Sequence, residues 1–429
     1  MKRLFMTMGV VLAALSGCGQ KEPALEQVPE PSYYKNATYF TEKFGMYDMI
    51  PVVENDIVMV GDDYIDRGLW TEFFGMNNIK NRGITYDGTE HVLYRIDKIA
   101  QGKPAKLFLS VGYNDVVRGV EVDTSVVRIG EIFNRVSKIS PKTKLYYINA
   151  IASSEEIAGK IEELNSKVLE LSRSGLFEYI DADTPMRDGI RSGKYSYNEG
   201  LHLNGAGYAA FCQVFERQIG VQHRNVAVEW NYENEFFDYY KARATIFSSC
   251  PADSHKVVML GDSMNNNASW GELFPDVDLI NRGISGDTAG GILQRLDEVI
   301  SHNPEKIFLL TGPNDFINDK ELTPEGLWAS YEKLVTAVRT ALPETELYIE
   351  SILPMNPKSR FYEGYNARAA AEDEILAAAA EKYGFTFIDL VPSMVDGNND
   401  LKDEYTSDGL HLTAEGYKVW MSALENYIR

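Results

Sequence analysis

Short apolar runs and amphipathic stretches alternate along this chain, and the alternation occurs in both halves. In the second half, short runs rich in apolar and β-branched residues predict buried strands. The stretches between them place apolar side chains at helical spacing or are rich in alanine, which predicts helices. The predicted strands are residues 256–260, 279–280, 306–311, 346–353 and 385–390. The predicted helices are residues 288–300, 324–342, 367–383 and 414–427.

The first half shows the same series, with strands predicted at 56–60, 106–111 and 144–148 and a closing helix at 205–219. Strands that alternate with helices predict a parallel sheet covered by helices on both faces, so the fold class is α/β. In such sheets, ligand sites form at the carboxyl ends of the strands.

The two halves match at a constant offset of 200 residues, so the chain contains a duplicated domain. Asn81-Arg82-Gly83-Ile84 corresponds to Asn281-Arg282-Gly283-Ile284, for example. Residues 230–247 contain neither glycine nor proline and predict a helix that leads into the second half. Tyr33-Tyr34-Lys35 and Tyr239-Tyr240-Lys241 stand in similar places before each half, so we expect the duplicated unit to include this leader helix.

This repeat defines the domain organisation that the sequence predicts. The expected parts are a signal peptide (1–18), a flexible tether (19–32), a first domain (33–222), a connecting leader helix (223–250) and a second domain (251–429).

The composition of the 429 residues is that of a globular protein, with 44% hydrophobic and 24% charged residues. The net charge of -21 argues against nucleic acid as a partner, because its phosphate backbone attracts basic surfaces. Besides Cys18, the chain has only Cys212 and Cys250, which supports neither a disulfide framework nor a zinc site.

The N-terminus resembles a bacterial lipoprotein signal. Lys2 and Arg3 precede an apolar run, residues 4–15, that is too short to span a bilayer, and Leu15-Ser16-Gly17-Cys18 follows. The resemblance implies a cell-envelope lipoprotein that is anchored to a membrane through a lipid on Cys18. No aspartate follows this cysteine, which favours attachment to the outer membrane. The sequence does not indicate whether the protein is on the periplasmic or the outer face of that membrane. The alternative is an ordinary secretory signal.

Four segments of the second half together resemble the SGNH or GDSL hydrolase family. They are Gly261-Asp262-Ser263, Asn281-Arg282-Gly283, Gly312-Pro313-Asn314-Asp315 and Asp408-Gly409-Leu410-His411. The segment Asn281–Thr288 is most similar to the branch that holds platelet-activating-factor acetylhydrolase subunits and carbohydrate O-acetylesterases, including sialate-type enzymes. The resemblance implies two tandem three-layer αβα, flavodoxin-like domains with parallel central sheets.

The chemistry of these residues fits ester hydrolysis through an acyl-enzyme. Ser263 supplies a nucleophilic hydroxyl, His411 a base, and Asp408 a carboxylate that orients the histidine. We expect the oxyanion to be held by the backbone N–H groups of Ser263 and Gly283 and by the side-chain amide of Asn314. This chemistry needs no metal and no cofactor.

The first half keeps Gly83, Asn114 and His202, but Asp63 stands in place of the serine and Glu199 in place of the aspartate. Without the hydroxyl, we expect a catalytically inactive domain in which Asp63 forms an ion pair with His202. It would serve as a scaffold that packs on the active domain as an internal pseudo-dimer, or as a glycan-binding domain.

The substrate is predicted from the surroundings of the nucleophile. No long insertion resembling a lipid-binding lid interrupts the second half, and Asn265-Asn266-Asn267 makes the nearby surface polar. Both features favour an acetyl ester on a carbohydrate such as sialic acid, plant polysaccharide or peptidoglycan. Arg282 and Arg295 have no assigned role; they are surface or ion-pair residues, or one meets an anionic sugar.

Two alternatives remain open at this point. The first is a lysophospholipase or phospholipid acetylhydrolase, which acyl-chain preference would distinguish from a carbohydrate esterase. The second is a glycan-binding lipoprotein in which neither domain turns over.

Overall fold

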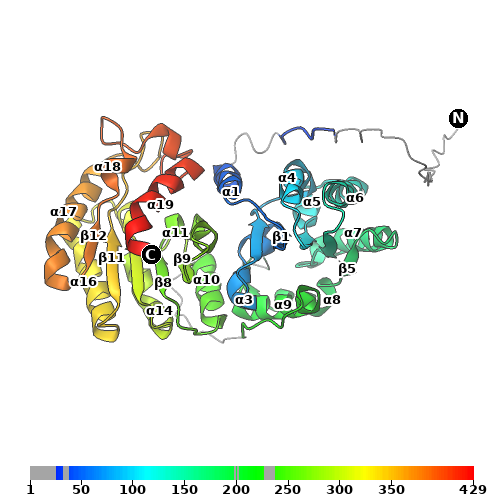
Figure 1. The fold of residues 1–429 in the computed structure, drawn as a ribbon, viewed down its shortest axis with the longest axis horizontal. Helices are drawn as coiled ribbons and strands as arrows, with labels where there is room; N and C mark the ends of the chain where they lie inside the picture. The colour runs from blue at the N-terminus through cyan, green and yellow to red at the C-terminus, as the bar shows by residue number, and fades with distance from the viewer. Residues whose placement is uncertain (1–25, 32–37, 198–199, 201, 227–236) are drawn as a thin grey trace, which may run out of the picture.

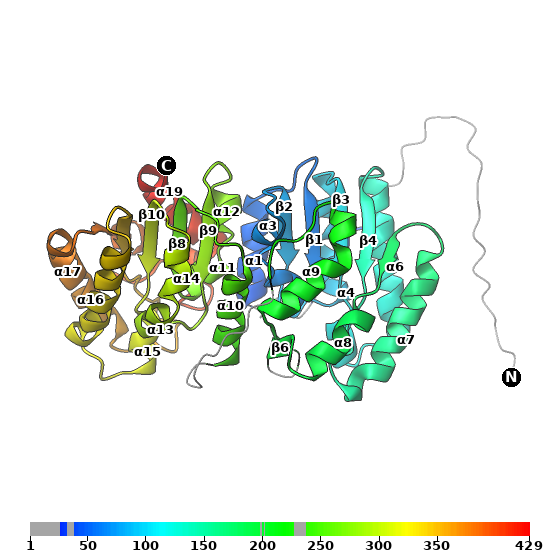
Figure 2. The same cartoon turned by 90° about the horizontal axis from the view of Figure 1, so that it is seen from below.

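A computed structural model of the protein describes residues 26–31, 38–197, 200, 202–226 and 237–429. Each half of the chain forms one five-stranded parallel sheet, and the two sheets lie side by side (Figures 1 and 2). The first-domain strands are β1 (Ile57–Gly61), β2 (Ile79–Gly83), β3 (Lys106–Ser110), β4 (Lys144–Ile148) and β5 (Glu178–Ile180). The second-domain strands are β8 (Val257–Gly261), β9 (Leu279–Gly283), β10 (Lys306–Leu310), β11 (Glu346–Glu350) and β12 (Thr386–Ile388).

The two sheets have the same topology. Their strand orders are β2-β1-β3-β4-β5 and β9-β8-β10-β11-β12, so each repeat places its first strand between its second and third. In the second domain, Gly261 pairs with Gly283 and with Leu310 at the carboxyl ends of the strands. The segments that follow these three strands therefore meet at one edge of the sheet.

Helices cover both faces of each sheet, which confirms the three-layer prediction. In the second domain, Val258 and Leu260 pack on one side and Val257 and Met259 on the other. The first side is covered by α13 (Ala289–Gln294), α14 (Leu296–Ser301), α16 (Pro324–Ala341) and α17 (Tyr365–Tyr383). The second is covered by α11 (Ser263–Asn267), α12 (Trp270–Leu273), α18 (Val391–Met394) and α19 (Ala414–Ile428).

The first domain repeats this arrangement. One face carries α4 (Thr89–Gln101), α6 (Val122–Ile139) and α7 (Glu155–Ser172), and the other carries α3 (Trp70–Phe74), α8 (Asp183–Arg191) and α9 (Gly205–Ile219). Apart from the two leader helices, the short elements that remain in the first domain are α2 (Asp63–Asp66), α5 (Tyr113–Val117), β6 (Ser196–Tyr197) and β7 (His202–Leu203). Those in the second domain are α15 (Pro313–Asn318) and a short 3-10 helix (Asp403–Tyr405).

Two leader helices of equal length, α1 (Thr38–Met49) and α10 (Asp238–Ser249), lie between the domains (Figure 2). Each leader packs on both of them. Met46 of α1 joins the core of the second domain beside α19, whereas Tyr47 packs on Ile84 of the first. Ile246 of α10 joins the core of the first domain, whereas Phe247 packs on Ile284 of the second.

The contact between the domains has approximate two-fold symmetry. Arg82 donates to the carboxylate of Glu272 at 3.0 and 3.1 Å, and Arg282 donates to the carboxylate of Glu72 at 2.9 and 3.1 Å. Such a reciprocal pattern, in which each patch contacts the copy of its own partner, is that of a homodimer with a two-fold axis. An internal pseudo-dimer, as predicted from the sequence, would be expected to show such a pattern.

Most predicted elements match the observed ones within a few residues, and the helix at 205–219 has the bounds predicted. The stretch at 288–300 differs, because α13 ends at Gln294 and α14 begins at Leu296, with Arg295 between them. Gly290 and Gly291 in the first turn weaken a continuous helix there. Only the part of the predicted 230–247 helix beyond residue 237 lies within the described residues. Cys18 and the tether up to residue 25 lie outside them. Among the described helices, none combines the length and the hydropathy required to cross a membrane.

Candidate active site

Ser263, His411 and Asp408 come together at the carboxyl edge of the second sheet. The Oγ atom of Ser263 lies 3.1 Å from Nε2 of His411, and Nδ1 of the same ring lies 2.7 Å from Oδ2 of Asp408. Oδ1 of Asp408 accepts the backbone N–H groups of Leu410 and His411, both at 2.8 Å. The carboxylate is therefore fixed by its own loop, and the ring can accept the serine proton at Nε2.

The electrostatics of this pair suit a general base. Burial raises the pKa of Asp408, but the hydrogen bond and positive charge of His411 outweigh it and lower the pKa to about 2. Burial lowers the pKa of His411, but Asp408 raises it above its ordinary value, with smaller contributions from Glu42 and Asp262. The carboxylate thus stays ionised and stabilises the imidazolium that forms when Ser263 loses its proton.

The turn that carries Ser263 is held by the residues around it. Asp262 caps α11 by accepting the N–H of Met264 at 3.0 Å. A side chain at Gly283 would come 2.2 Å from the backbone nitrogen of Asn266, so glycine lets β9 pack closely against α11. Asp262 and Gly283 therefore shape the nucleophile turn.

This role for Gly283 corrects the prediction made for the oxyanion site. Its backbone N–H donates to the side-chain oxygen of Asn281 at 2.8 Å and is not free to receive an oxyanion. Gly286, three residues later, lines the same cleft as Ser263 and Asn314. Its φ of +82° is one that glycine adopts readily.

The first domain shows where an oxyanion would bind, because Asp63 places a carboxylate there. Oδ2 of Asp63 accepts the backbone N–H of Tyr86 at 3.1 Å and the side-chain amide of Asn114 at 3.2 Å. At the constant offset, these two donors correspond to Gly286 and Asn314. An oxyanion at the corresponding place in the second domain would meet the N–H groups of Ser263 and Gly286 and the amide of Asn314.

The amide of Asn314 is prepared for this role. One of its hydrogens is bonded to the carbonyl oxygen of Asp287 at 2.9 Å, as Asn114 bonds to that of Asp87 at 3.0 Å. In the first domain the second hydrogen goes to Asp63. In the second domain it remains for the substrate.

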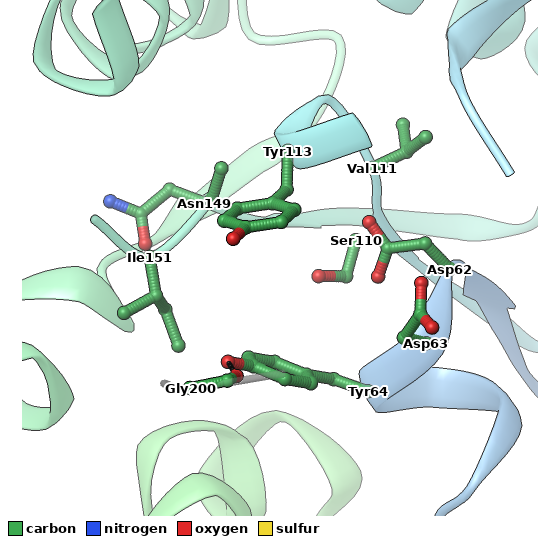
Figure 3. A pocket seen from close by; sticks show the side chains of 10 residues that line it. Asp62, Asp63, Tyr64, Ser110, Val111, Tyr113, Asn149, Ile151 and Gly200 are labelled. Carbon is green, nitrogen blue, oxygen red and sulfur yellow. Dashed lines mark hydrogen bonds between the residues drawn. The ribbon is translucent and has the colours of Figure 1, made fainter. Parts of the chain in front are cut away.

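The first-domain site differs from the prediction in its ion pair. Asp63 pairs with Arg67 at 3.4 Å, and Arg67 also contacts Nδ1 of His202. The guanidinium thus stands beside Nδ1 of His202. Glu199 lies outside the described residues. A cavity of only about 20 Å³ remains at this edge of the sheet, where the rings of Tyr64 and Tyr113 narrow it (Figure 3).

The second-domain site opens into a cleft of about 640 Å³ that both domains line. The first domain and the leader helices contribute residues that no alignment of the second repeat alone would reveal. The aromatic residues that line the cleft are Tyr39, Phe40, Tyr86, Phe237, Tyr239 and Phe361. The polar residues that line it include Glu42, Arg67, Asn266, Asn267, Ser285 and Arg360. Tyr86 and Phe237 are each 49% exposed.

The two arginines without an assigned role are structural. Arg282 is fully buried between Glu72 and Glu298, and Arg295 pairs with Asp287 at 2.9 Å. Neither lines the cleft, so the suggestion that one of them meets an anionic sugar is wrong.

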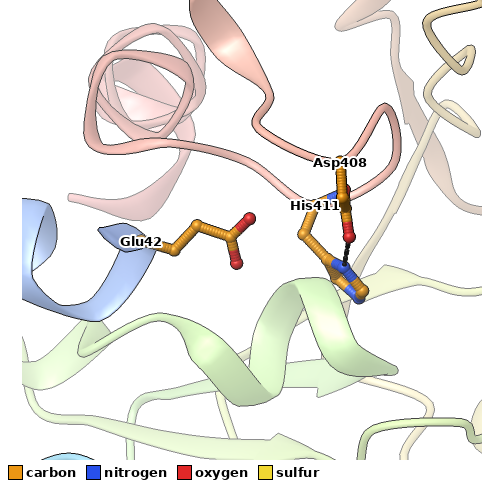
Figure 4. Close-up of side chains that lie close together, drawn as sticks. All are labelled: Glu42, Asp408 and His411. Carbon is orange, nitrogen blue, oxygen red and sulfur yellow. Dashed lines mark hydrogen bonds and ion pairs between the residues drawn. The ribbon is translucent and has the colours of Figure 1, made fainter. Parts of the chain in front are cut away.

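Within the part of the chain that the structure describes, one group of side chains has ligand atoms close enough for a metal ion. The atoms of Glu42, Asp408 and His411 lie within 4.8 Å of one another (Figure 4). A metal would have to replace the 2.7 Å hydrogen bond between His411 and Asp408, which the triad already explains. The absence of a metal and of a cofactor stays a prediction.

Residues 60–210 and 259–419 each match the family described as GDSL-like lipase/acylhydrolase. Platelet-activating factor acetylhydrolase IB subunit alpha2 of Gallus gallus is 27% identical over 177 residues, which are 40% of this chain and 74% of the relative. Subunit alpha1 of Pongo abelii is 27% identical over 208 residues, which are 46% of this chain and 88% of the relative. A solved GDSL-like lipase from Bacteroides thetaiotaomicron is 23% identical with a TM-score of 0.40, covering 44% of this chain and 96% of that one.

Proposed function

Because both halves of this chain belong to the GDSL-like lipase/acylhydrolase family, we propose that the second domain is a serine esterase that releases acetyl groups from carbohydrates. The observation that carries the proposal is the hydrogen-bonded series Ser263–His411–Asp408, which opens into a cleft that Gly286 and Asn314 also line. Oγ of Ser263 would attack the ester carbon while its proton moves to Nε2 of His411. The imidazolium would then protonate the leaving sugar oxygen, and water would release acetate from Ser263.

The lining of the cleft supports a sugar as the acyl carrier. A sugar ring presents C–H groups on its faces and hydroxyls at its edge. Exposed rings such as Tyr86 and Phe237 suit the faces, whereas the amides of Asn266 and Asn267 suit the hydroxyls. Which glycan is acetylated, and at which position, is for the assay to determine.

The test is acetate release by the soluble chain that begins at Gly19. O-acetylated sialoglycans, acetylated xylan and peptidoglycan would be supplied, with Ser263→Ala as the variant that lacks the nucleophile. We expect release from at least one glycan and none from the variant. A protein that retains a glycan but releases no acyl group from any ester would instead be a binding protein.

A phospholipid acetylhydrolase or lysophospholipase is the second candidate. The observation in its favour is apolar cleft lining, namely Phe40, Phe237, Ile317, Phe361 and Leu410, and two relatives carry the name acetylhydrolase. Acyl esters of two to twelve carbons separate the candidates. Activity confined to acetyl favours the sugar, and activity that rises with chain length favours lipid.

We propose that the first domain is catalytically inactive. Asp63 has no hydroxyl, and its carboxylate takes the donors that an oxyanion would need. Restoring the serine should not be enough, because Arg67 still contacts His202. The double variant Ser263→Ala, Asp63→Ser should release no acetate; measurable release would show that the first site needs only its nucleophile.

The N-terminal sequence supports attachment to the cell envelope through a lipid on Cys18, and the outer membrane is proposed. Labelling with a radioactive fatty acid in a bacterial host tests this. We expect incorporation into the full chain and none into Cys18→Ser, whereas an unlabelled secreted product would indicate an ordinary signal peptide.

A further inference from the structure

Glu42 reaches the active site of the second domain from the leader helix of the first. It lies on α1, is 5% exposed, and accepts the hydroxyl of Ser407 at 2.6 Å. Figure 4 shows its carboxylate directed toward the loop that carries Asp408 and His411. A carboxylate oxygen of Glu42 and the ligand atoms of those two residues lie within 4.8 Å of one another.

This carboxylate is buried. Among the described residues, no lysine or arginine nitrogen lies within 4.0 Å of its oxygens, which is the limit for an ion pair. Lys43, its neighbour on α1, pairs with Asp66 instead. Burying an unpaired carboxylate is costly, so its charge has to be compensated by the groups that face it. Those groups are the hydroxyl of Ser407 and the ring of His411.

The two repeats differ at the position of Glu42, and they also differ in whether they have a complete triad. The counterpart of Glu42 on α10 is Ala242, which is also buried and has no charge. The acid is therefore present only where the helix faces a complete triad. A residue that served only to pack the leader helices would be expected on both of them.

We propose that Glu42 is a positioning residue for the triad of the neighbouring domain: it holds the Asp408 loop through Ser407 and places a second negative charge beside His411. The first domain thus completes the active site of the second. Glu42 acts when Ser263 attacks, as the O–H bond of the serine breaks and an N–H bond forms at Nε2 of His411. The new imidazolium then lies close to two carboxylates, which stabilise it more than one would.

The ionisable groups around this cluster determine the charge that His411 meets. His411 is faced by Asp408, Glu42 and Asp262, which raise its pKa, and Tyr417 of α19 lies near both Glu42 and Asp262. Burial raises the pKa of Glu42 to about 7, although His411 and Ser407 lower it and Asp408 raises it further. Glu42 therefore carries its full negative charge only above about pH 7, and its effect on His411 is expected in that range.

This inference rests on the proposed esterase activity, so its test has a readout that needs no substrate. Glu42→Gln keeps an oxygen for Ser407 and removes the charge, whereas Ser407→Ala keeps the charge and removes the hydrogen bond. The first readout is the NMR titration of the His411 imidazole. The second is the pH profile of kcat/KM with p-nitrophenyl acetate. Glu272→Gln, which weakens an interdomain ion pair outside the cleft, is the matched control.

We expect Glu42→Gln to lower the pKa of His411, to move the acid limb of kcat/KM to lower pH, and to reduce kcat roughly tenfold, the scale for one charge at 4–6 Å. Glu42→Asp should recover part of the shift, and Glu272→Gln should leave the titration where it is. An unchanged His411 titration in folded Glu42→Gln overturns the proposal. If the wild type hydrolyses no ester, the esterase assignment fails, yet the imidazole titration still decides the role of Glu42.

Discussion

Arg282 provides the sharpest test of how the two domains are held together. Its guanidinium is 0% exposed and binds Glu72 across the interface and Glu298 within its own domain. Burial raises the pKa of Glu298, but Arg282 and a hydrogen bond from His302 outweigh it and lower the pKa from 4.5 to about 2. At about 1.4 kcal/mol per pKa unit, this shift corresponds to about 3 kcal/mol of folding free energy at neutral pH.

Arg282→Met leaves two carboxylates without their arginine, so we expect a loss of about 3–5 kcal/mol at pH 7. The loss should depend on pH in a fixed direction. A lowered native pKa stabilises the fold above about pH 4.5, and the contribution disappears as the pH falls toward 2. The gap between wild type and variant should therefore narrow on acidification from pH 7 to pH 3.

Urea unfolding across this pH range measures the gap, since urea does not screen charges as guanidinium does. The matched control is Arg82→Met, which removes the symmetry-related ion pair to Glu272. Position 98, the counterpart of Glu298, is an exposed Lys98, so the control loses one carboxylate partner and should cost less. Equal losses in the two variants, or a gap that stays constant with pH, would refute this reasoning.

Three further predictions concern the site. Asn314→Ala should lower kcat for p-nitrophenyl acetate about 10²–10³-fold with little change in KM, whereas the matched Asn114→Ala should leave kcat unchanged. The pKa of His411 is raised, so the base is neutral only at higher pH, and kcat/KM should reach half its maximum above pH 6.5; Asp408→Asn should shift this limb to lower pH. Gly283→Ala should lower the melting temperature, because its Cβ would lie 2.2 Å from a backbone nitrogen, whereas Gly286→Ala, at a φ of +82°, should chiefly reduce activity.

The strands, the topology and the triad could be predicted because each depends on local pattern or on a motif within one repeat. Buried strands show as apolar runs, and the motifs fall at strand ends where a parallel sheet gathers them. The sequence thus predicted a triad whose members, Ser263, His411 and Asp408, do not all lie close together in the chain. The hydrogen bonds at 3.1 and 2.7 Å are consistent with the roles assigned to them.

The prediction for Gly283 was wrong for a physical reason. A glycine next to a catalytic turn can allow close packing of the backbone, or it can offer a free backbone N–H to the substrate. A single sequence does not distinguish these two roles. Both repeats keep this glycine, and in both its N–H donates to the preceding asparagine at 2.8 Å. The exchange of contacts by α1 and α10 was also beyond prediction, because hydrophobic pattern says that a helix is buried but not against which domain.

A duplicated chain does contain a signal that separates these cases, namely the positions at which its two copies differ. A residue that both copies share can serve the fold alone, as Gly83 and Gly283 show. Residues that differ report the chemistry. The differing pairs around the site include Asp63 and Ser263, Tyr86 and Gly286, Arg67 and Asn267, and Glu42 and Ala242.

The last of these pairs changes what the first domain is for. In the first three, the residue that suits the proposed reaction or its substrate stands in the second domain. For Glu42 the direction is reversed, since the first repeat carries the acid and delivers it through α1 to the other domain. Tyr39, Phe40 and Tyr86 line the same cleft. The first repeat therefore forms one wall of the cleft that holds Ser263, which gives a structural reason for the two copies to stay on one chain.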